Sequence, residues 1–587
     1  MIDYAIKELD KDSIFYEVGQ DITYWVYKEN FQTETLRMKE LNMIIEVLGR
    51  RTKRNPLLIG EPGVGKSFLI KQLAKLVIDE KVPFWIKDNK IIKTSFNDIM
   101  ASLKNRDYSW PEYVSKLNRL LNEASTKNIV LFMDEIHYIG LGYPMSMNII
   151  KPYLAEGKIK LIGATTPNEY RMYLEKETAF TRRFQIIKIS EPDKDELIKI
   201  LNSEISNLEK YYNGLEMEKD YVDFIIKLSE EYIPYRSQPD KSIDILEQTF
   251  INCVMKGKET IEKRDIYETV SKITGIPIDI IEDEKNRIFG LESVLNRRVL
   301  GQEEGIRKIC ERLKITTSKV QINKNRPLGI FLISGPSGVG KTEFAKSLAL
   351  YFTGDENNLI YIDMSIYKTV YSLEHLLGIT FRRDEYFEDP YLTKKIKQNP
   401  YSVLLLDEID KAEPDVLSIF LQAFDQGKLT DYAGNEIYLN NLIILMTCNI
   451  GFERKNVIKI KDEDFDEEKK DIIKSIENYF TKEFLGRVDE IIIFNKLTDK
   501  IIDGFINQKL NKLIEFNKKD IRIGDKLRNL IKEYGFSNEY GARRLNNIID
   551  KYIGKVLAEI KYKEKWDEIK NIFIDIDENN NLIYEIN

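Results

Sequence analysis

One segment of the chain reads Gly60-Glu-Pro-Gly-Val-Gly-Lys-Ser67, and another reads Gly335-Pro-Ser-Gly-Val-Gly-Lys-Thr342. Each follows an apolar run typical of a buried strand, and each precedes a segment with helical periodicity, residues 68–79 and 343–352. The pattern Gly-x-x-x-x-Gly-Lys-Ser/Thr between a strand and a helix is that of a phosphate-binding loop. The sequence therefore predicts two sites for the phosphates of a nucleotide.

Each residue type in these loops has a chemical task. Glycine lets the backbone amides turn toward the phosphates, the lysine reaches the β- and γ-phosphate oxygens, and the hydroxyl ligates Mg²⁺. ATP and Mg²⁺ are therefore the predicted ligands. The residues predicted to bind them are Gly60, Gly63, Gly65, Lys66 and Ser67 in the first loop, and Gly335, Gly338, Gly340, Lys341 and Thr342 in the second.

The segments after each loop recur in the same order. A buried strand ending in Asp-Glu comes first, at residues 129–135 and 403–408, and a strand ending in polar residues comes next, at 160–166 and 442–449. Continuous apolar runs separated by helical segments indicate parallel strands covered on both faces. The predicted fold class is α/β, with two tandem phosphate-loop modules that each contain a parallel-sheet domain and a small helical domain.

The chain is long enough for several domains at roughly 100–200 residues each. Pro192 followed by Asp193 indicates the start of a helix, because proline and acidic residues suit the first helical turn. The predicted division is an N-terminal segment at 1–32, a first α/β domain at 33–192, a first small helical domain at 193–287, a second α/β domain at 288–497 and a second small helical domain at 498–587.

Polar side chains at the strand ends are predicted to complete the chemistry. A carboxylate at the end of a buried strand can hold Mg²⁺, and its neighbour can orient and activate the attacking water. A polar residue on the next strand can sense the γ-phosphate or position that water, with capping of the strand end as the alternative role. The residues are Asp134 and Asp407 for Mg²⁺, Glu135 and Glu408 for the water, and Thr166 and Asn449 for the γ-phosphate.

The composition excludes several classes of protein. Hydrophobic residues make up 43% of the 587, which is enough for several cores and excludes wholesale disorder. The net charge of −7 argues against a globally basic surface for nucleic acid. Three distant cysteines and two histidines predict neither a disulfide scaffold nor a His-based metal centre. No secretory signal or membrane span is expected, so a cytoplasmic protein is predicted.

These motifs resemble the AAA+ ATPases, in particular the two-ring Clp unfoldases. The first half carries Gly163-Ala-Thr-Thr-Pro-Asn-Glu-Tyr170, Arg182-Arg-Phe-Gln185 and Pro239-Asp-Lys-Ser-Ile-Asp244. The second half carries Val299-Leu-Gly-Gln302, Leu406-Asp-Glu-Ile-Asp-Lys-Ala412, Phe484-Leu-Gly-Arg-Val-Asp-Glu490 and Gly541-Ala-Arg543. The motifs stand in the family's order from about Arg37 to near the end. The resemblance implies a homo-hexamer in which each ATP site is completed by its neighbour.

Four arginines acquire predicted roles from this resemblance. Arg182 and Arg183 match the arginine finger of the first module, and Arg487 matches that of the second. A finger from the neighbouring subunit neutralises charge on the phosphoryl group in the transition state. Arg543 matches the sensor arginine of the small domain, which touches the γ-phosphate within its own chain.

The chain also departs from the family pattern. Only a short segment precedes the first module, so the resemblance is to a ClpA- or ClpC-like member without the N-terminal domain, and a separate adaptor protein could supply its role. In the pore-loop regions, Asn105 stands near Tyr108 and Trp110, and residues 378–387 lack the usual Gly-Tyr-Val-Gly. Gripping of a polypeptide and simple packing both remain open for these aromatics.

Two segments of the chain compare with the loop by which family members dock a peptidase, and neither matches it fully. Ile450-Gly-Phe452 has the letters of the family tripeptide, but it follows the sensor strand directly, and residues 457–460 stand where the docking loop is expected. Whether a peptidase partner docks is left open.

The predicted function is an ATPase that unfolds or remodels protein, hydrolysing ATP in two stacked rings to move a polypeptide. One alternative is a dedicated remodeller of a single partner assembly. A nucleic-acid motor is the less favoured alternative, based on basic and aromatic residues near 104–110 and 381–383. A scaffold without turnover conflicts with the two complete sets of catalytic residues.

Overall fold

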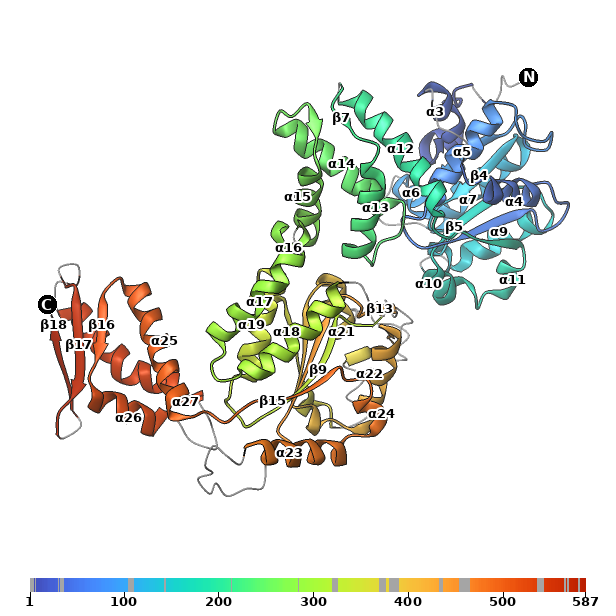
Figure 1. The fold of residues 1–587 in the computed structure, drawn as a ribbon. Coiled ribbons are helices and arrows are strands. Elements are labelled where there is room, and N and C mark those ends of the chain that lie inside the picture. The colour runs from blue at the N-terminus through green and yellow to red at the C-terminus, as the bar shows by residue number, and fades with distance from the viewer. Residues whose placement is uncertain are drawn as a thin grey trace. The chain divides into compact units, whose positions relative to one another are not determined.

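The computed structural model describes the chain except for residues 1–4, 6, 30, 32–35, 104–109, 142–143, 213, 283, 319–325, 369–375, 379–389, 432–435, 453–464, 536–542, 564–565, 567–568, 579–580 and 587. The chain forms two compact units, Met1–Val270 and Ser271–Asn587, and each is described by itself. Both contain a sheet covered by helices and a smaller domain rich in helices (Figure 1).

The sheet of the first unit has the strand order β1-β3-β4-β5-β2-β6. All neighbouring pairs are parallel except β1 with β3. The strands are β1 (Gln20–Asp21), β2 (Asn55–Ile59), β3 (Lys90–Thr94), β4 (Ile129–Met133), β5 (Lys160–Thr165) and β6 (Phe184–Lys188). The predicted parallel strands at 129–133 and 160–165 are confirmed, while β3 and β6 were not singled out in the sequence.

Successive residues of β4 face opposite layers of helices, which explains its continuous apolar run. Val130 and Phe132 pack with α3 (Ile22–Lys28), α4 (Met38–Leu48) and α5 (Lys66–Ile78). Leu131 and Met133 pack on the other side with α2 (Ile14–Val18), α6 (Phe96–Ala101), α7 (Trp110–Thr126) and α9 (Pro144–Ala155). A strand buried on both faces needs an apolar side chain at every position.

The N-terminal segment is tied into this sheet by a buried lysine. Gln20 and Asp21 pair with Lys93 and Ile92 of β3. The Lys90 ammonium donates to Asp21 Oδ2 at 2.7 Å, to the Ala5 carbonyl at 3.2 Å and to the carbonyl of Lys7. Both members of the ion pair are almost fully buried. The segment before α4 is therefore part of the first unit's core.

Replacing Lys90 with methionine is expected to destabilise the first unit by about 3–5 kcal/mol, because it leaves the Asp21 carboxylate buried without a cation. The free energy of unfolding can be followed in urea by fluorescence, since three of the four tryptophans, Trp25, Trp85 and Trp110, lie in this unit. Adding Asp21→Asn should recover part of the loss, because the amide can still accept from Tyr24 N–H as the carboxylate does. Unchanged unfolding of Lys90→Met would refute the anchoring role.

The helical part of the first unit contains α12 (Lys194–Tyr211), α13 (Tyr221–Tyr232), α14 (Asp240–Met255) and the first eight residues of α15 (Lys263–Thr274), with the short parallel pair β7 (Glu216–Met217) and β8 (Thr260–Ile261). The predicted helix start is confirmed, because Asp193 caps α12 by accepting from Glu196 N–H at 2.8 Å. An acidic cap also offsets the partial positive charge of the helix N-terminus.

The second unit repeats the plan with the strand order β10-β11-β14-β9-β15, parallel throughout. The strands are β9 (Gly329–Ser334), β10 (Leu359–Asp363), β11 (Val403–Asp407), β14 (Ile443–Cys448) and β15 (Glu490–Ile493). Other elements of this domain are α16 (Ile278–Glu282), α17 (Glu284–Arg298), α18 (Glu303–Thr317), α19 (Lys341–Thr353), α21 (Tyr391–Gln398), α22 (Pro414–Gln426), α23 (Phe465–Tyr479) and the hairpin β12 (Lys428–Thr430) with β13 (Glu436–Tyr438).

The second small domain contains both helices and a sheet. The helices are α25 (Asp499–Asn517), α26 (Asp525–Gly535), α27 (Arg543–Ile549) and α28 (Lys555–Lys563). The sheet joins β16 (Asp520–Ile523), β17 (Asn571–Ile576) and β18 (Leu582–Ile586), with β17 parallel to β16 and antiparallel to β18 (Figure 1). The sequence analysis found the helical part of this domain but not the sheet.

Candidate ATP-binding and catalytic sites

Both phosphate loops end in a glycine that begins a long helix. Gly65 caps α5 with φ 92°, and Gly340 caps α19 with φ 104°. Side chains rarely adopt this left-handed conformation, so glycine suits both positions. At Gly63 a Cβ atom would lie only 2.6 Å from the Cβ of Asp240. Each loop therefore presents the N-terminus of a 13-residue helix, where amide groups bind anions.

Both loop lysines donate to carbonyl oxygens of their own loops, and Lys341 also donates to oxygens at the end of β14. Lys66 Nζ donates to the Gly60 carbonyl at 2.7 Å and to the Glu61 carbonyl at 3.0 Å. Burial lowers the pKa of Lys66, and the nearby carboxylates, Asp134 foremost, oppose that shift. Lys341 Nζ donates to the Cys448 carbonyl at 3.2 Å and to Asn449 Oδ1 at 2.7 Å. Both ammonium groups are positioned to exchange these oxygens for phosphate oxygens.

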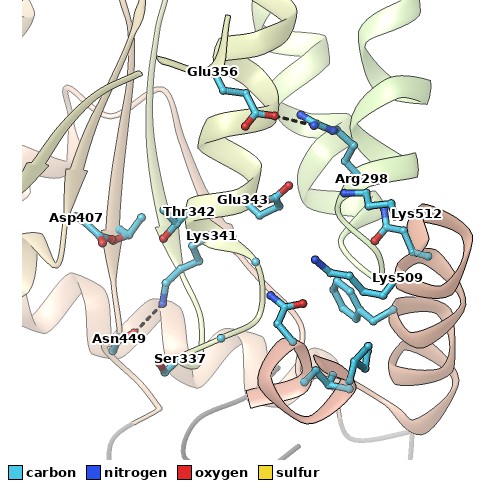
Figure 2. A pocket seen from close by; sticks show the side chains of 18 of the residues that line it. Arg298, Ser337, Lys341, Thr342, Glu343, Glu356, Asp407, Asn449, Lys509 and Lys512 are labelled. Carbon is cyan, nitrogen blue, oxygen red and sulfur yellow. Dashed lines mark hydrogen bonds and ion pairs between the residues drawn. The ribbon is translucent and has the colours of Figure 1, made fainter. Parts of the chain in front are cut away.

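The second site opens into a cavity of about 500 Å³. Figure 2 shows Lys341, Thr342, Asp407 and Asn449 on the sheet side of this cavity, facing α25 of the small domain. The sequence analysis missed the contribution of α25, whose Lys509 and Lys512 add two cations to the lining. Cations on two sides suit a polyanionic ligand.

The first site opens into a cavity of about 380 Å³ that has a larger apolar share. Phe31, Leu36, Ile200 and Ile243 line it beside the phosphate loop. Buried Arg37 adopts a left-handed conformation and donates to the Val64 carbonyl at 2.9 Å and to the Ser190 carbonyl at 2.6 Å. Apolar walls next to a phosphate loop suit the base of a nucleotide. The sequence analysis assigned these residues no role.

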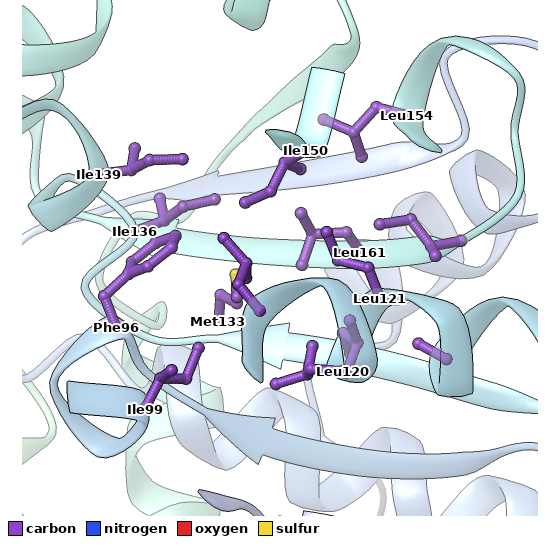
Figure 3. Packing of buried hydrophobic residues seen from close by; sticks show 14 of the residues in the cluster. Phe96, Ile99, Leu120, Leu121, Met133, Ile136, Ile139, Ile150, Leu154 and Leu161 are labelled. Carbon is purple, nitrogen blue, oxygen red and sulfur yellow. The ribbon is translucent and has the colours of Figure 1, made fainter. Parts of the chain in front are cut away.

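Packing on both sides fixes the first acidic pair. Met133 and Ile136, which flank Asp134-Glu135, are fully buried in one apolar cluster with Leu120, Leu161 and Ile150 (Figure 3). The pair therefore leaves the core at a defined point, where the carboxyl end of a parallel strand meets the phosphate loop.

Both predicted catalytic glutamates have the same unusual backbone. Glu135 has φ 50° and Glu408 has φ 55°, which is the left-handed region that residues with a side chain seldom occupy. Glu408 N–H donates to Thr447 Oγ1 at 3.0 Å, and Glu135 N–H donates to Asp134 Oδ1 at 3.2 Å. Such conformations cost free energy and occur at functional sites where the surroundings hold them in place.

The oxygen atoms near each loop fit Mg²⁺. Ser67 Oγ lies 3.5 Å from Asp134 Oδ2, so a hydroxyl and a carboxylate converge at the first loop. In the second site, Thr342 and Asp407 line one cavity. Magnesium is usually held by one or two protein oxygens together with water and substrate phosphates. One carboxylate and one hydroxyl in each site match this coordination preference.

The two aspartates have different neighbours. Asp407 accepts from Tyr361 Oη at 3.1 Å and from the hydroxyl of Thr447. Burial, together with the Asp407 carboxylate, raises the pKa of Tyr361 to about 12, which keeps this hydroxyl a donor. Asp134 instead forms an ion pair with Lys93, whose Nζ lies 2.8 Å from Oδ2. The sequence analysis missed Lys93, Tyr361 and Thr447.

The two predicted γ-phosphate sensors are placed differently. Asn449 contacts the loop lysine of its site, as described above. The Thr166 hydroxyl accepts from Glu169 N–H at 3.3 Å, and Thr166 N–H donates to Glu169 Oε2 at 3.0 Å, so Thr166 caps helix α10 (Pro167–Glu169). These contacts cap the helix that follows β5, which differs from the strand-end capping given as the alternative, and the γ-phosphate role of Thr166 stays a prediction.

The predicted finger arginines also differ between modules. Arg182 and Arg183 are exposed, and within the described residues neither guanidinium group has an ion pair or hydrogen bond. Arg487 Nε donates to Asp425 Oδ2 at 2.7 Å, and its NH2 atom lies 3.2 Å from Glu483 Oε1. Among the described residues, the first pair thus has exposed and unengaged guanidinium groups, whereas Arg487 is held by two carboxylates of its own chain.

Several other predicted features lie outside the described residues. These are the Arg543 side chain, Asn105 and Tyr108 of the first pore-loop region, the aromatics of the second region and residues 457–460 of the docking region. Of the helices that the structure describes, none is long and apolar enough to cross a membrane.

Four sequence families match consecutive parts of the chain. Residues 56–186 match the ATPase family associated with various cellular activities (AAA), and residues 193–289 match an AAA lid domain. Residues 326–491 match the AAA domain of the Cdc48 subfamily, and residues 495–574 match the C-terminal, D2-small domain of ClpB protein.

Two curated proteins are similar along most of the chain. The negative regulator of genetic competence ClpC/MecB of Bacillus subtilis is 32% identical over 639 residues, covering 96% of this chain and 78% of that protein. The ATP-dependent Clp protease ATP-binding subunit ClpC of Staphylococcus aureus is 33% identical over 620 residues, covering 92% of this chain and 75% of that protein.

Two solved structures have a similar fold. The Saccharomyces cerevisiae Hsp104-ADP complex has a TM-score of 0.80 and 32% identity, covering 98% of this chain and 100% of that chain. The closed state of Hsp104 with ATPγS and FITC casein has a TM-score of 0.79 and 32% identity, covering 98% and 99%.

Proposed function

Because the chain belongs to the ClpC-type Clp ATPases of the AAA family, we propose that it hydrolyses ATP in two stacked rings and thereby moves a polypeptide through a homo-hexamer. The membership confirms the predicted family, the two-module α/β fold and an ATPase that unfolds or remodels protein. We further propose that the subunits form rings, that the polypeptide passes through them, and that the residues named below carry out the reaction.

The observation that supports turnover at both sites is the matched backbone of Glu135 and Glu408. Each follows a strand-terminal aspartate beside a phosphate loop whose lysine and hydroxyl are in place. A site that only bound nucleotide would have no use for a glutamate held in a costly conformation in both modules.

The proposed reaction divides among the chain's own residues. The amides of the two loops and Lys66 or Lys341 hold the phosphates, and Glu135 or Glu408 orients the attacking water. Asn449, which already contacts Lys341, positions the γ-phosphate end in the second site. Mg²⁺ at Ser67 and Asp134, or at Thr342 and Asp407, would neutralise developing charge on the phosphate oxygens.

We assign the finger role to Arg182 and Arg183 in the first ring and to Arg487 in the second, each acting on the neighbouring subunit. The guanidinium groups of the first pair are exposed and make no ion pair or hydrogen bond among the residues that the structure describes, which supports this assignment. In the second ring, assembly would transfer Arg487 from Asp425 to the neighbour's phosphoryl group. We also propose a cytoplasmic location, with which the three free, buried cysteines agree.

Substrate engagement is tested with the double variant Glu135→Gln, Glu408→Gln. This chain should bind ATP without completing hydrolysis, and should therefore retain a fluorescently labelled unfolded protein in an ATP-dependent complex that co-elutes with the hexamer. The matched control is the unmodified chain, which should release the label as ATP is consumed. Retention of no protein at all, despite ATP binding, would refute a polypeptide motor, and salt-sensitive retention of DNA would favour the nucleic-acid alternative.

A further inference from the structure

Lys93 stands at the same sheet position in the first module as Tyr361 does in the second. Lys93 pairs with Phe132, two residues before Asp134. Tyr361 pairs with Leu405, two residues before Asp407. Each side chain reaches the aspartate of its own module, Lys93 Nζ at 2.8 Å and Tyr361 Oη at 3.1 Å. The two ATP sites therefore differ by one full charge at this point.

A second replacement strengthens the difference. Ile59 and Ser334 each directly precede the first glycine of a phosphate loop, so they are equivalent positions in the two modules. Ile59 pairs with Thr165 and Ser334 pairs with Cys448, which makes Thr165 and Cys448 equivalent as well. Thr447, whose hydroxyl donates to Asp407, thus corresponds to Ala164, which has no donor. Two neutral hydroxyl groups hold Asp407 and leave its negative charge intact, whereas an ammonium group neutralises Asp134.

The backbone of Lys93 is held on both sides. It pairs with β4 through Phe132 and with β1 through Gln20. Its ammonium group also lies 6.0 Å from the ring centroid of buried Phe132. The side chain is 35% exposed, so its end can move away from Asp134 into solvent. A lysine on a fixed strand with a mobile end can occupy a cation site and leave it.

We propose that Lys93 occupies the cation position of the first ATP site, so that this site needs a higher Mg²⁺ concentration than the second. The inference rests on the proposed role of Asp134 as a Mg²⁺ ligand. The Lys93 ammonium group beside Asp134 repels a divalent cation and must move away before the carboxylate can bind that cation. In the second site the corresponding position holds the neutral hydroxyl of Tyr361.

The test measures binding of mant-ATP to the full chain at a series of Mg²⁺ concentrations. Lys341→Ala confines the signal to the first site, and Glu135→Gln prevents turnover there. In this background Lys93→Met should lower the Mg²⁺ concentration at half-maximal binding by about tenfold, as expected for removing one nearby like charge at the rim of a site. Lys93→Arg keeps the charge and should keep the higher requirement.

The matched control is Tyr361→Phe, measured at the second site in a Lys66→Ala, Glu408→Gln chain, where no comparable fall in the Mg²⁺ requirement is expected. An unchanged or increased requirement in Lys93→Met, with the melting temperature preserved, would overturn the proposal. Loss of mant-ATP binding at every Mg²⁺ concentration would overturn it too, because Lys93 would then contact phosphate. If the chain with Lys93 intact bound no mant-ATP, the proposed ATP site itself would fail.

Discussion

A chain that carries Arg182→Ala and Arg183→Ala is expected to lose roughly 10³–10⁵-fold in ATP turnover at its first sites while still binding ATP. The reason is the place of these side chains, which are exposed and have no ion pair or hydrogen bond to any part of the chain that the structure describes. Their charge would be needed only where the neighbour's phosphoryl group becomes most negative. Turnover is measured in a Lys341→Ala background, so that the second sites are silent.

An experiment with mixed hexamers of two variants distinguishes an arginine finger from an arginine that only stabilises the fold. Chains with both arginines replaced are mixed with chains that carry Lys66→Ala, which keep their fingers but have no working loop. Each alone should be inactive at the first sites, and mixed hexamers should regain turnover. Arg264→Ala, at an exposed position on α15, serves as the control and should leave turnover unchanged. Absence of recovery in verified mixed hexamers would rule out action between subunits.

The second large effect is expected from the glutamates. Glu135→Gln should reduce turnover at the first sites, and Glu408→Gln at the second sites, by about 10²–10⁴-fold, because an amide cannot accept a proton from water. Glutamine keeps the size of the side chain, so the left-handed backbone at both positions should be unaffected. Nucleotide binding and hexamer formation should therefore persist.

Steady-state turnover and mant-ATP binding measured on the same samples provide the check. The control is Glu156→Gln, which changes an exposed glutamate that pairs with Lys158 and lines neither ATP cavity. If either catalytic variant kept more than about a tenth of the turnover at its own site, the glutamate would not be the group that activates water, since general bases contribute more than that.

The parts of the fold that could be predicted from the sequence are those determined by residues close together in the chain. The strand, loop and helix around Lys66 and Lys341 each lie within a short stretch. The short apolar runs before Asp134 and Asp407 are typical of strands buried on both faces. The family motifs then placed these elements in two modules. Each of these features depends on neighbours in the chain, which a single sequence displays.

The parts that escaped prediction depend on register between distant segments. Lys93 reads as an ordinary polar residue in a strand until its pairing with Phe132 places it beside Asp134. Lys509 and Lys512 read as the polar face of a helix until α25 closes one side of a cavity. Ile572, Ile574 and Ile576 of β17 alternate with more exposed residues, but the strands that they pair with lie about 50 residues earlier in β16 and about 10 residues later in β18.

The outermost strand of an open sheet offers unpaired amides and carbonyls to any extended peptide that reaches it. In the first unit, Gln20 and Asp21 already occupy that side of β3 at Lys93 and Ile92, and Lys90 secures them. The outermost strand that an unfolded cargo meets there is therefore β1, whose two residues offer only a short template for strand addition. The short edge strand thus lowers the tendency of this ATPase to aggregate with the unfolded proteins on which it acts.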